Sequence, residues 1–292
     1  MDHVFEVRAF PSEPVKTPAQ AYRPRGGGMS FNAAIAAARL GASVRLLSRV
    51  GDDAAAVALC RSLRLEQVDA QGVEAVADTQ TSASAVIVDG LGERHIFNHR
   101  GNALLRAHRL DTAQLQGADA ILTDPRWTAG AQAALRWARR HDVLSVLDAD
   151  VAPRQDLRRL VGLARWAVFS QSGLAAFAPG MAEDDALRAA LSLGCEVAVV
   201  TQGRKGARWT RGQALNQAKA PQVSSRDTTA AGDVFHAALA LALAEGRSDE
   251  AALSWACAAA ALKCQRGDGV FGAPRRDELQ RYLAAIAWGV QD

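Results

Sequence analysis

The residues best placed for chemistry form a run of small side chains that ends in a carboxylate. Residues 227–233 read Asp-Thr-Thr-Ala-Ala-Gly-Asp and continue directly into an apolar helical pattern. Small residues at 230–232 let backbone N–H groups approach a ligand at the first turn of a helix. Unpaired donors and the helix dipole there favour an anion such as a phosphate in transfer. Asp233 could accept the proton of an attacking hydroxyl. The same residues also fit an ordinary helix start, capped by Thr228 or Thr229.

A second glycine-rich segment precedes a helical pattern near the start of the chain. Residues 27–34 read Gly-Gly-Met-Ser-Phe-Asn-Ala-Ala, so that two glycines stand five and four residues before Asn32. Glycines allow the backbone to approach a polyol, and the Asn32 amide offers donors and an acceptor to sugar hydroxyls. Flexible glycines before a helix would explain the same pattern. The dinucleotide-binding spacing is absent from this segment, and no phosphate-binding P-loop motif occurs in the chain.

Together, the two segments resemble the two signatures of the ribokinase (PfkB) family, G-G-x-x-x-N-x-A and D-T-x-G-A-G-D before an apolar helix. The resemblance implies an ATP-dependent carbohydrate kinase that uses Mg²⁺, with Asp233 as the catalytic base. It also assigns the anion hole to the backbone amides of Ala230, Ala231 and Gly232. The second signature departs at Ala230, where the family normally has glycine. An alanine fits there if its φ is negative and is strained if the turn needs a positive φ.

Further segments extend the resemblance over essentially the whole chain. Asp2 matches the Asp that contacts sugar hydroxyls in the family, and Gly27, Gly28 and Asn32 complete that sugar-binding set. Residues 201–206 and 263–274 resemble the segments that line the nucleotide. The resemblance thus implies nucleotide contacts from Thr201, Gly203, Gly206, Thr228, Lys263, Gly267 and Gly269.

The substrate is expected to be a ketose-like sugar phosphorylated on a primary hydroxyl. Local features around residues 123–127 and 146–150 resemble most closely the sulfofructose kinase branch, whose sulfonate ligands correspond to Lys16, Asn98 and Arg126. Fixed cations and an amide donor suit an anionic head group. The alternative is a neutral-sugar kinase of fructokinase or ribokinase type, with Lys16 solvated and Arg126 paired with a carboxylate. A catalytically dead binding relative also stays open, because residues 170–173 lack the acid of the family's N-x-x-E motif.

The composition argues against several other classes of protein. A formal net charge of +3 with dispersed Lys and Arg does not indicate a nucleic-acid partner. The four cysteines show no CxxC spacing, so neither a zinc site nor a disulfide framework is indicated. We expect no signal peptide, and the most apolar helical patterns of the chain are too short to cross a bilayer. We therefore expect a cytoplasmic protein without a membrane partner.

The order of apolar patterns predicts the fold class. Short β-branched runs alternate with alanine-rich helical stretches, which is typical of an α/β fold: a ribokinase-like, doubly wound, mostly parallel sheet with helices on both faces. We predict helices over 31–40, 130–140, 231–245, 250–264 and 276–288. We predict strands over 43–50, 119–123, 143–148, 166–169 and 195–201.

One region departs from this alternation. Residues 81–88 and 93–99 are β-rich and flank the turn sequence at 89–92, which indicates a hairpin. With the extended residues 4–7, they are expected to form a small β lid, about 3–16 and 81–99, that closes over the sugar. Exposed apolar side chains on such a lid could pair two subunits in a homodimer. We expect residues 1–292 to form a single kinase domain, whose first core strand, normally ahead of the Asp matching Asp2, is missing before Met1.

Overall fold

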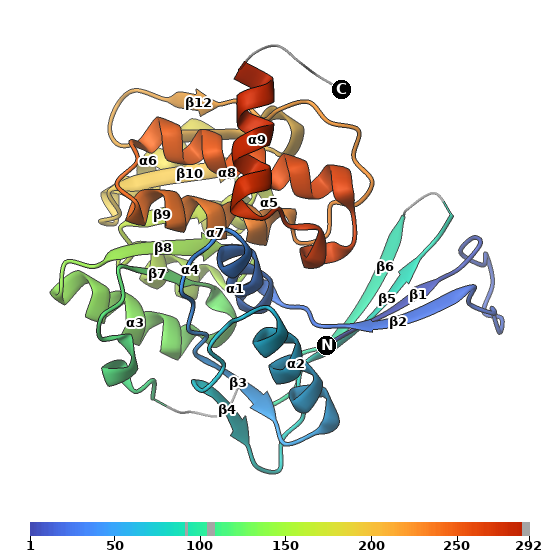
Figure 1. Cartoon of the computed structure of the whole chain (residues 1–292). Coiled ribbons are helices and arrows are strands. Elements are labelled where there is room, and N and C mark those ends of the chain that lie inside the picture. Colours follow the sequence, from blue (N-terminus) through green and yellow to red (C-terminus); the bar gives the residue numbers. More distant parts are fainter. Residues whose placement is uncertain (91–92, 104–108, 288–292) are drawn as a thin grey trace. The chain divides into compact units, whose positions relative to one another are not determined.

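The computed structural model describes residues 1–90, 93–103 and 109–287, and the chain divides into two compact units. The first unit comprises Met1–Phe31 and Arg45–Ala107, and the second comprises Asn32–Val44 and His108–Asp292. Figure 1 follows the chain through both units. Among the described residues, no helix combines the length and the apolar character that crossing a bilayer requires.

The first unit contains a four-stranded sheet in the order β2-β1-β5-β6. Its strands are β1 (Asp2–Glu6), β2 (Ala21–Arg25), β5 (Ala83–Val88) and β6 (Arg94–His99). β1 and β5 are parallel, whereas the β1–β2 and β5–β6 pairs are antiparallel. The predicted hairpin is therefore present as β5 and β6, while Leu91 and Gly92 of its turn lie outside the described residues.

β2 was not predicted, and its composition explains why. Its sequence, Ala-Tyr-Arg-Pro-Arg, contains a proline that cannot donate to a ladder and two arginines that break the apolar alternation. Such a segment is compatible with an edge strand only, and β2 indeed pairs on one side alone, with β1. The first unit also contains β3 (Ser48–Gly51) parallel to β4 (Val73–Val76), joined through α2 (Ala54–Leu65).

The second unit contains a six-stranded sheet in the order β12-β11-β10-β9-β8-β7. The parallel strands are β7 (Ala120–Thr123), β8 (Leu144–Ala149), β9 (Trp166–Phe169) and β10 (Val197–Thr201). β11 (Ala207–Thr210) and β12 (Asn216–Ala218) extend it in antiparallel pairing. The four parallel strands are the ones predicted from short apolar runs, and the mostly parallel α/β fold is confirmed.

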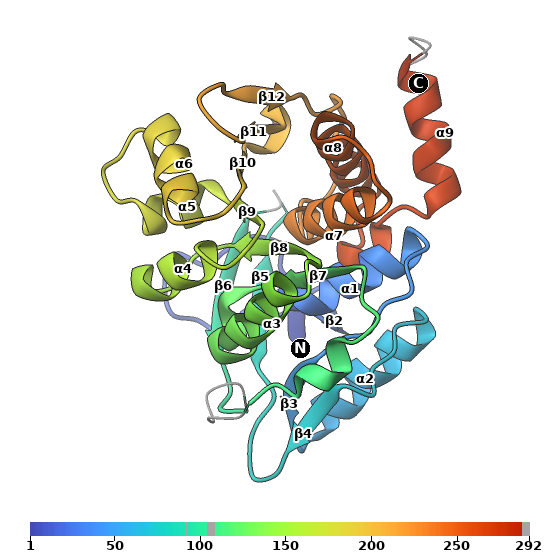
Figure 2. The ribbon, with the colours of Figure 1, turned by 90° about the vertical axis from the view of Figure 1, so that its left-hand side faces the viewer.

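Helices cover both faces of this sheet (Figure 2). One face is covered by α3 (Thr128–Arg140), α4 (Arg154–Val161), α5 (Gln171–Phe177) and α6 (Glu183–Ser192). The other face is covered by α7 (Ala231–Ala244) and α8 (Asp249–Arg266), and α9 (Arg276–Ala287) packs against α8. The predicted helices agree with these bounds to within a few residues, except that Trp288 lies outside the described residues.

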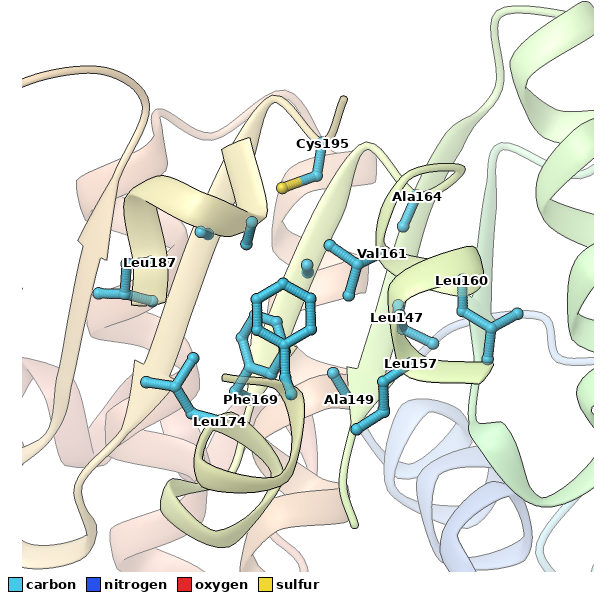
Figure 3. Packing of buried hydrophobic residues seen from close by; sticks show 14 of the residues in the cluster. Leu147, Ala149, Leu157, Leu160, Val161, Ala164, Phe169, Leu174, Leu187 and Cys195 are labelled. Atoms are coloured by element: carbon cyan, nitrogen blue, oxygen red, sulfur yellow. The ribbon is translucent and has the colours of Figure 1, made fainter. Parts of the chain in front are cut away.

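The core between the sheet and α3–α6 is aliphatic with a pair of phenylalanines (Figure 3). Leu147 and Ala149 of β8 and Phe169 of β9 point into it and are fully buried. Burial of each large side chain contributes about 1.5–3 kcal/mol. Because successive strand side chains alternate between faces, Asp148 points instead to the face that α7 covers. The alternation of side chains along β8 thus places the Asp148 carboxylate on the side of the sheet where α7 lies.

Candidate active site

The sequence left open whether the turn before α7 needs a positive φ at Ala230, and the structure shows that it does. Ala230 is the N-cap of α7 and adopts a left-handed conformation, with φ 62° and ψ 11°. Its carbonyl accepts the Val234 N–H at 2.9 Å, which starts the helix. A left-handed conformation costs a non-glycine residue about 1–2 kcal/mol. Ala230 is therefore strained, and neighbouring contacts must hold it.

The three amides expected to form the anion hole lie on this turn. The Ala231 N–H is 3.2 Å from the Thr228 carbonyl, so a ligand there would share or replace that bond. Gly232 is exposed, and a Cβ built on it would meet no described atom within 4 Å. Open space over a small-residue helix start fits a phosphate group.

Asp233 lies in the first turn of α7 and is held by an asparagine. Asn32, on α1 (Met29–Arg39), donates from Nδ2 to Asp233 Oδ2 at 2.7 Å. Burial, followed by the nearby Asp148 carboxyl, raises the pKa of Asp233 to about 7, although the Asn32 hydrogen bond and His236 oppose this rise. A carboxylate with a pKa near the working pH is well suited to general base catalysis. Asn32 was predicted as a sugar ligand, and the structure shows it in contact with Asp233, the predicted base.

A buried acid and a histidine lie behind Asp233. Asp148 Oδ2 is 3.3 Å from Nδ1 of His236, and that nitrogen is also 2.7 Å from the Gly232 carbonyl. Burial, and then the charges of Asp124 and Asp150, raise the pKa of Asp148 well above its ordinary value. Burial lowers the pKa of His236, which favours the neutral imidazole. Sequence reasoning gave His236 no role, whereas Asp148 was visible as an acid at the end of the predicted strand 143–148.

The predicted nucleotide residues near the end of α8 surround Asp227. Its Oδ1 accepts the Thr229 N–H and its Oδ2 accepts the Gly269 N–H, both at 2.8 Å. Lys263 donates from Nζ to the Asp227 carbonyl at 2.8 Å and is fully buried. The Lys263 ammonium therefore faces this turn, and nucleotide contacts by that segment would come from the backbone around Gly267 and Gly269. Both glycines have positive φ, 79° and 56°.

The other predicted nucleotide segment follows β10. The Thr201 hydroxyl donates to the Phe169 carbonyl at 3.3 Å, and Gly203 is exposed with φ 55°. Gly206 has φ 92°, and a Cβ built on it would lie 2.0 Å from the Ala218 carbonyl oxygen. Gly206 is thus required by close packing between β11 and β12. Thr228 is exposed on the turn before α7.

Four predicted sugar residues belong to the first unit's sheet and the segment after β2. A Cβ built on Gly27 would lie 2.1 Å from Asp2 Oδ2, so glycine is needed where the backbone passes that carboxylate. Gly28 has φ 103°. Asp2 pairs with Ser84 and Ser84 with Asn98, which places the three on one row across β1, β5 and β6. Asn98 donates from Nδ2 to Ser84 Oγ at 3.1 Å.

Two cations were predicted to bind an acidic head group, and the structure places them in different units. Lys16 is exposed in the first unit, between β1 and β2. Arg126 belongs to the second unit, just after β7, where its guanidinium is 2.9 Å from Asp150 Oδ2 and donates to the Val151 carbonyl at 3.0 Å. Arg126 thus has the carboxylate partner that the alternative interpretation anticipated.

Comparisons with known proteins show which proteins the whole chain resembles. The sequence model of the family described as "pfkB family carbohydrate kinase" matches residues 1–276. A ribokinase of Bacillus subtilis is 29% identical over 264 residues, covering 88% of this chain and 87% of its own length. Fructokinase-2 of Zea mays is 30% identical over 244 residues, covering 76% and 72%. A crystal structure from Agrobacterium tumefaciens, provisionally assigned as a ribokinase, has a TM-score of 0.92 and 30% identity, covering 100% and 96%.

Proposed function

Because the chain belongs to the pfkB family of carbohydrate kinases and is an ATP-dependent sugar kinase, we propose that it phosphorylates a primary hydroxyl of a neutral, ketose-like sugar and uses Mg²⁺ together with ATP. The observation that carries the proposal is the position of Asp233 in the first turn of α7, with a pKa of about 7. Asp233 accepts the hydroxyl proton while that oxygen attacks the γ-phosphorus and ADP leaves. The amides at 230–232 stabilise the charge on the transferring phosphoryl group.

Magnesium is expected to enter with the nucleotide. Among the described residues, no group of three or more His, Cys, Asp or Glu side chains could hold a metal ion. Mg²⁺ commonly keeps several water ligands and binds through substrate phosphates with one or two carboxylates. ATP oxygens and water would thus supply most of its ligands.

The contacts of Arg126 favour a neutral sugar over an anionic one. Its guanidinium pairs with the Asp150 carboxylate, which offsets the charge that a sulfonate or phosphate would need. Asn98 is likewise engaged by Ser84. Two curated relatives, a ribokinase and a fructokinase, have names that agree with a neutral acceptor, whereas a third is named ATP-dependent ribose-1-phosphate kinase. An anionic ketose requires Arg126 to exchange Asp150 for the substrate, and this defines the second candidate.

An ADP-release assay over a panel of sugars tests the proposal. The panel holds ribose, deoxyribose, fructose and sulfonated and phosphorylated ketoses, with product analysis to locate the new phosphate. Asp233→Asn should abolish turnover, whereas Asp119→Asn, which alters an exposed carboxylate just before β7, should not. Arg126→Ala should lower kcat/KM about equally for neutral and anionic sugars. A loss confined to the anionic sugar, or a parental preference for that sugar, would favour the second candidate.

We also propose that the four-stranded sheet of the first unit is the sugar lid and pairs two subunits. Tyr22 and Phe97, which the strand register places on one face of this sheet, are 52% and 68% exposed. Apolar side chains exposed together on a sheet commonly mark an interaction surface. Light scattering at high concentration should report a dimer for the parent and a smaller species for Phe97→Glu. A strict monomer would remove the pairing half of the proposal.

A further inference from the structure

Lys263 is an unusual residue because its charged side chain is entirely withdrawn from solvent. Its exposed fraction is 0%, although it lies in the last turn of α8. Lysines are almost never fully buried unless they are paired, because removing an ammonium from water is costly. Its Nζ lies 2.8 Å from the Asp227 carbonyl oxygen and 3.2 Å from Asp227 Oδ2. Two contacts to Asp227, in the turn before α7, therefore help to offset the cost of burial.

Asp227 connects that turn to the loop that follows α8. Its two carboxylate oxygens accept N–H groups of Thr229 and Gly269, one on each side. The N–H groups of Arg226 and Asp227 donate to the Cys264 carbonyl at 2.9 and 3.2 Å. Burial alone would raise the pKa of Asp227, but the hydrogen bonds from Thr229 and Gly269 and the Lys263 charge hold this pKa well below its usual range. The carboxylate is thus ionised, and Lys263 supplies its counter-charge.

The turn held in this way is the strained one. Thr229, whose N–H is fixed by Asp227, directly precedes Ala230, which adopts the left-handed conformation. Strained backbone conformations persist only where the surroundings over-determine them. We propose that Lys263 is a positioning residue for phosphoryl transfer, because its ammonium, acting through Asp227, holds the amides at 230–232 in place. The same contacts couple these amides to the loop after α8, around Gly269, which is predicted to contact the nucleotide. This inference rests on the proposed roles of those amides and of that loop.

The location of the ammonium suggests a decisive experiment. Nζ lies between a carbonyl oxygen and a carboxylate oxygen, as a small bound cation would. Lys263→Ala removes charge and stem together and leaves a space that methylammonium can enter. Lys263→Met removes the charge but keeps the stem, so that space stays filled. Lys219→Met is the matched control, because Lys219 is exposed.

In the full-length enzyme with its preferred sugar, both Lys263 variants should lose roughly 10- to 100-fold in kcat, the effect of one charge-assisted hydrogen bond. The sugar KM should change by less than about threefold, because neither variant removes a contact that binds the sugar equally in the ground state and in the transition state. Methylammonium should restore Lys263→Ala and leave Lys263→Met unchanged, and Lys219→Met should match the parent. A folded Lys263→Met with parental kcat would overturn the proposal. The proposal would also be overturned if the loss of kcat were fully explained by a smaller fraction of folded protein. It would be overturned as well if methylammonium did not restore the kcat of Lys263→Ala.

Hydrogen exchange gives a readout that does not need turnover. Amides at 228–232 should exchange faster in Lys263→Met than in the parent, while amides of β8 should not change. Equal exchange at 228–232 would refute the inference even if no sugar in the panel were phosphorylated. A parent that is inactive on every sugar would instead count against the proposed function, so the two failures remain distinct.

Discussion

The hydrogen bond from Asn32 to Asp233 should set the pH at which the enzyme becomes active. Asn32 is 8% exposed and donates to Asp233 Oδ2 at 2.7 Å, which stabilises the ionised carboxylate. A hydrogen bond to a charged group contributes about 1.5–3 kcal/mol, which corresponds to about 1–2 pKa units at 1.36 kcal/mol per unit. Asn32→Leu keeps the side-chain volume and removes the donor. The pKa of Asp233, about 7 in the parent, should therefore rise by that amount.

The sign and size of the effect on rate follow from the base mechanism. Asp233 must be ionised to accept a proton, so activity should rise with pH through the pKa of this carboxyl. At pH 7 the ionised fraction should fall from about one half to between one tenth and one hundredth, which lowers kcat about 5- to 50-fold. The loss should disappear when the pH is raised well past the new pKa.

The assay is kcat against pH at saturating sugar and ATP, for parent and Asn32→Leu. Saturation matters because Asn32 is also a predicted sugar ligand, and its loss can raise KM. A midpoint that does not move, or that moves to lower pH, would refute the electrostatic role of Asn32. A loss of equal size at every pH would assign Asn32 to sugar positioning instead.

Two further predictions concern the same turn. Asp233→Asn should lower kcat by several orders of magnitude and also raise the melting temperature at pH 8, because the folded pKa of Asp233 lies above its unfolded value. Its contribution to stability is fully present below about pH 4 and is lost as the pH rises through about 7, so the gain should vanish near pH 4; an equal gain at both pH values would contradict this. Ala230→Gly should stabilise the folded state by about 1–2 kcal/mol, because it relieves backbone strain. It should also stabilise the unfolded state by about 0.4–1 kcal/mol, because glycine adds conformational entropy to the unfolded chain. Thermal unfolding should therefore show an unchanged or higher midpoint, and a clear decrease would mean that the Ala230 methyl group packs favourably.

The secondary structure was predictable where local pattern and tertiary environment agree. Fully buried parallel strands such as β9 are short apolar runs, and α7 and α8 are long alanine-rich stretches ended by turn residues. β2 escaped prediction because an edge strand needs only one partner and tolerates Pro24. Its existence depends on β1 being beside it, which no local pattern records.

The candidate site divides in the same way. The residues at 227–233 are contiguous, so the sequence could suggest an anion site with Asp233 beside it, and the family resemblance favoured that interpretation over an ordinary helix start. Asn32 was found for its amide, but its contact with Asp233 joins residues 201 positions apart. The His236–Asp148 contact and the Lys263–Asp227 pair likewise bring separate elements together. Side chains of these types are common on solvated surfaces, so only burial reveals that they belong to the site.

The sequence by itself predicted the family, through the resemblance of two glycine-rich segments to known signatures, and the fold class, through the alternation of apolar runs with helical stretches; both predictions are confirmed. The tertiary structure decided three properties that spacing does not encode. Asp233 acquires a pKa of about 7 because burial and Asp148 disfavour its charge. Ala230 takes a positive φ because the bonds of Asp227 hold the turn against about 1–2 kcal/mol of strain. Arg126 pairs with Asp150 because β7 and β8 are neighbours whose carboxyl ends meet at one edge of the sheet.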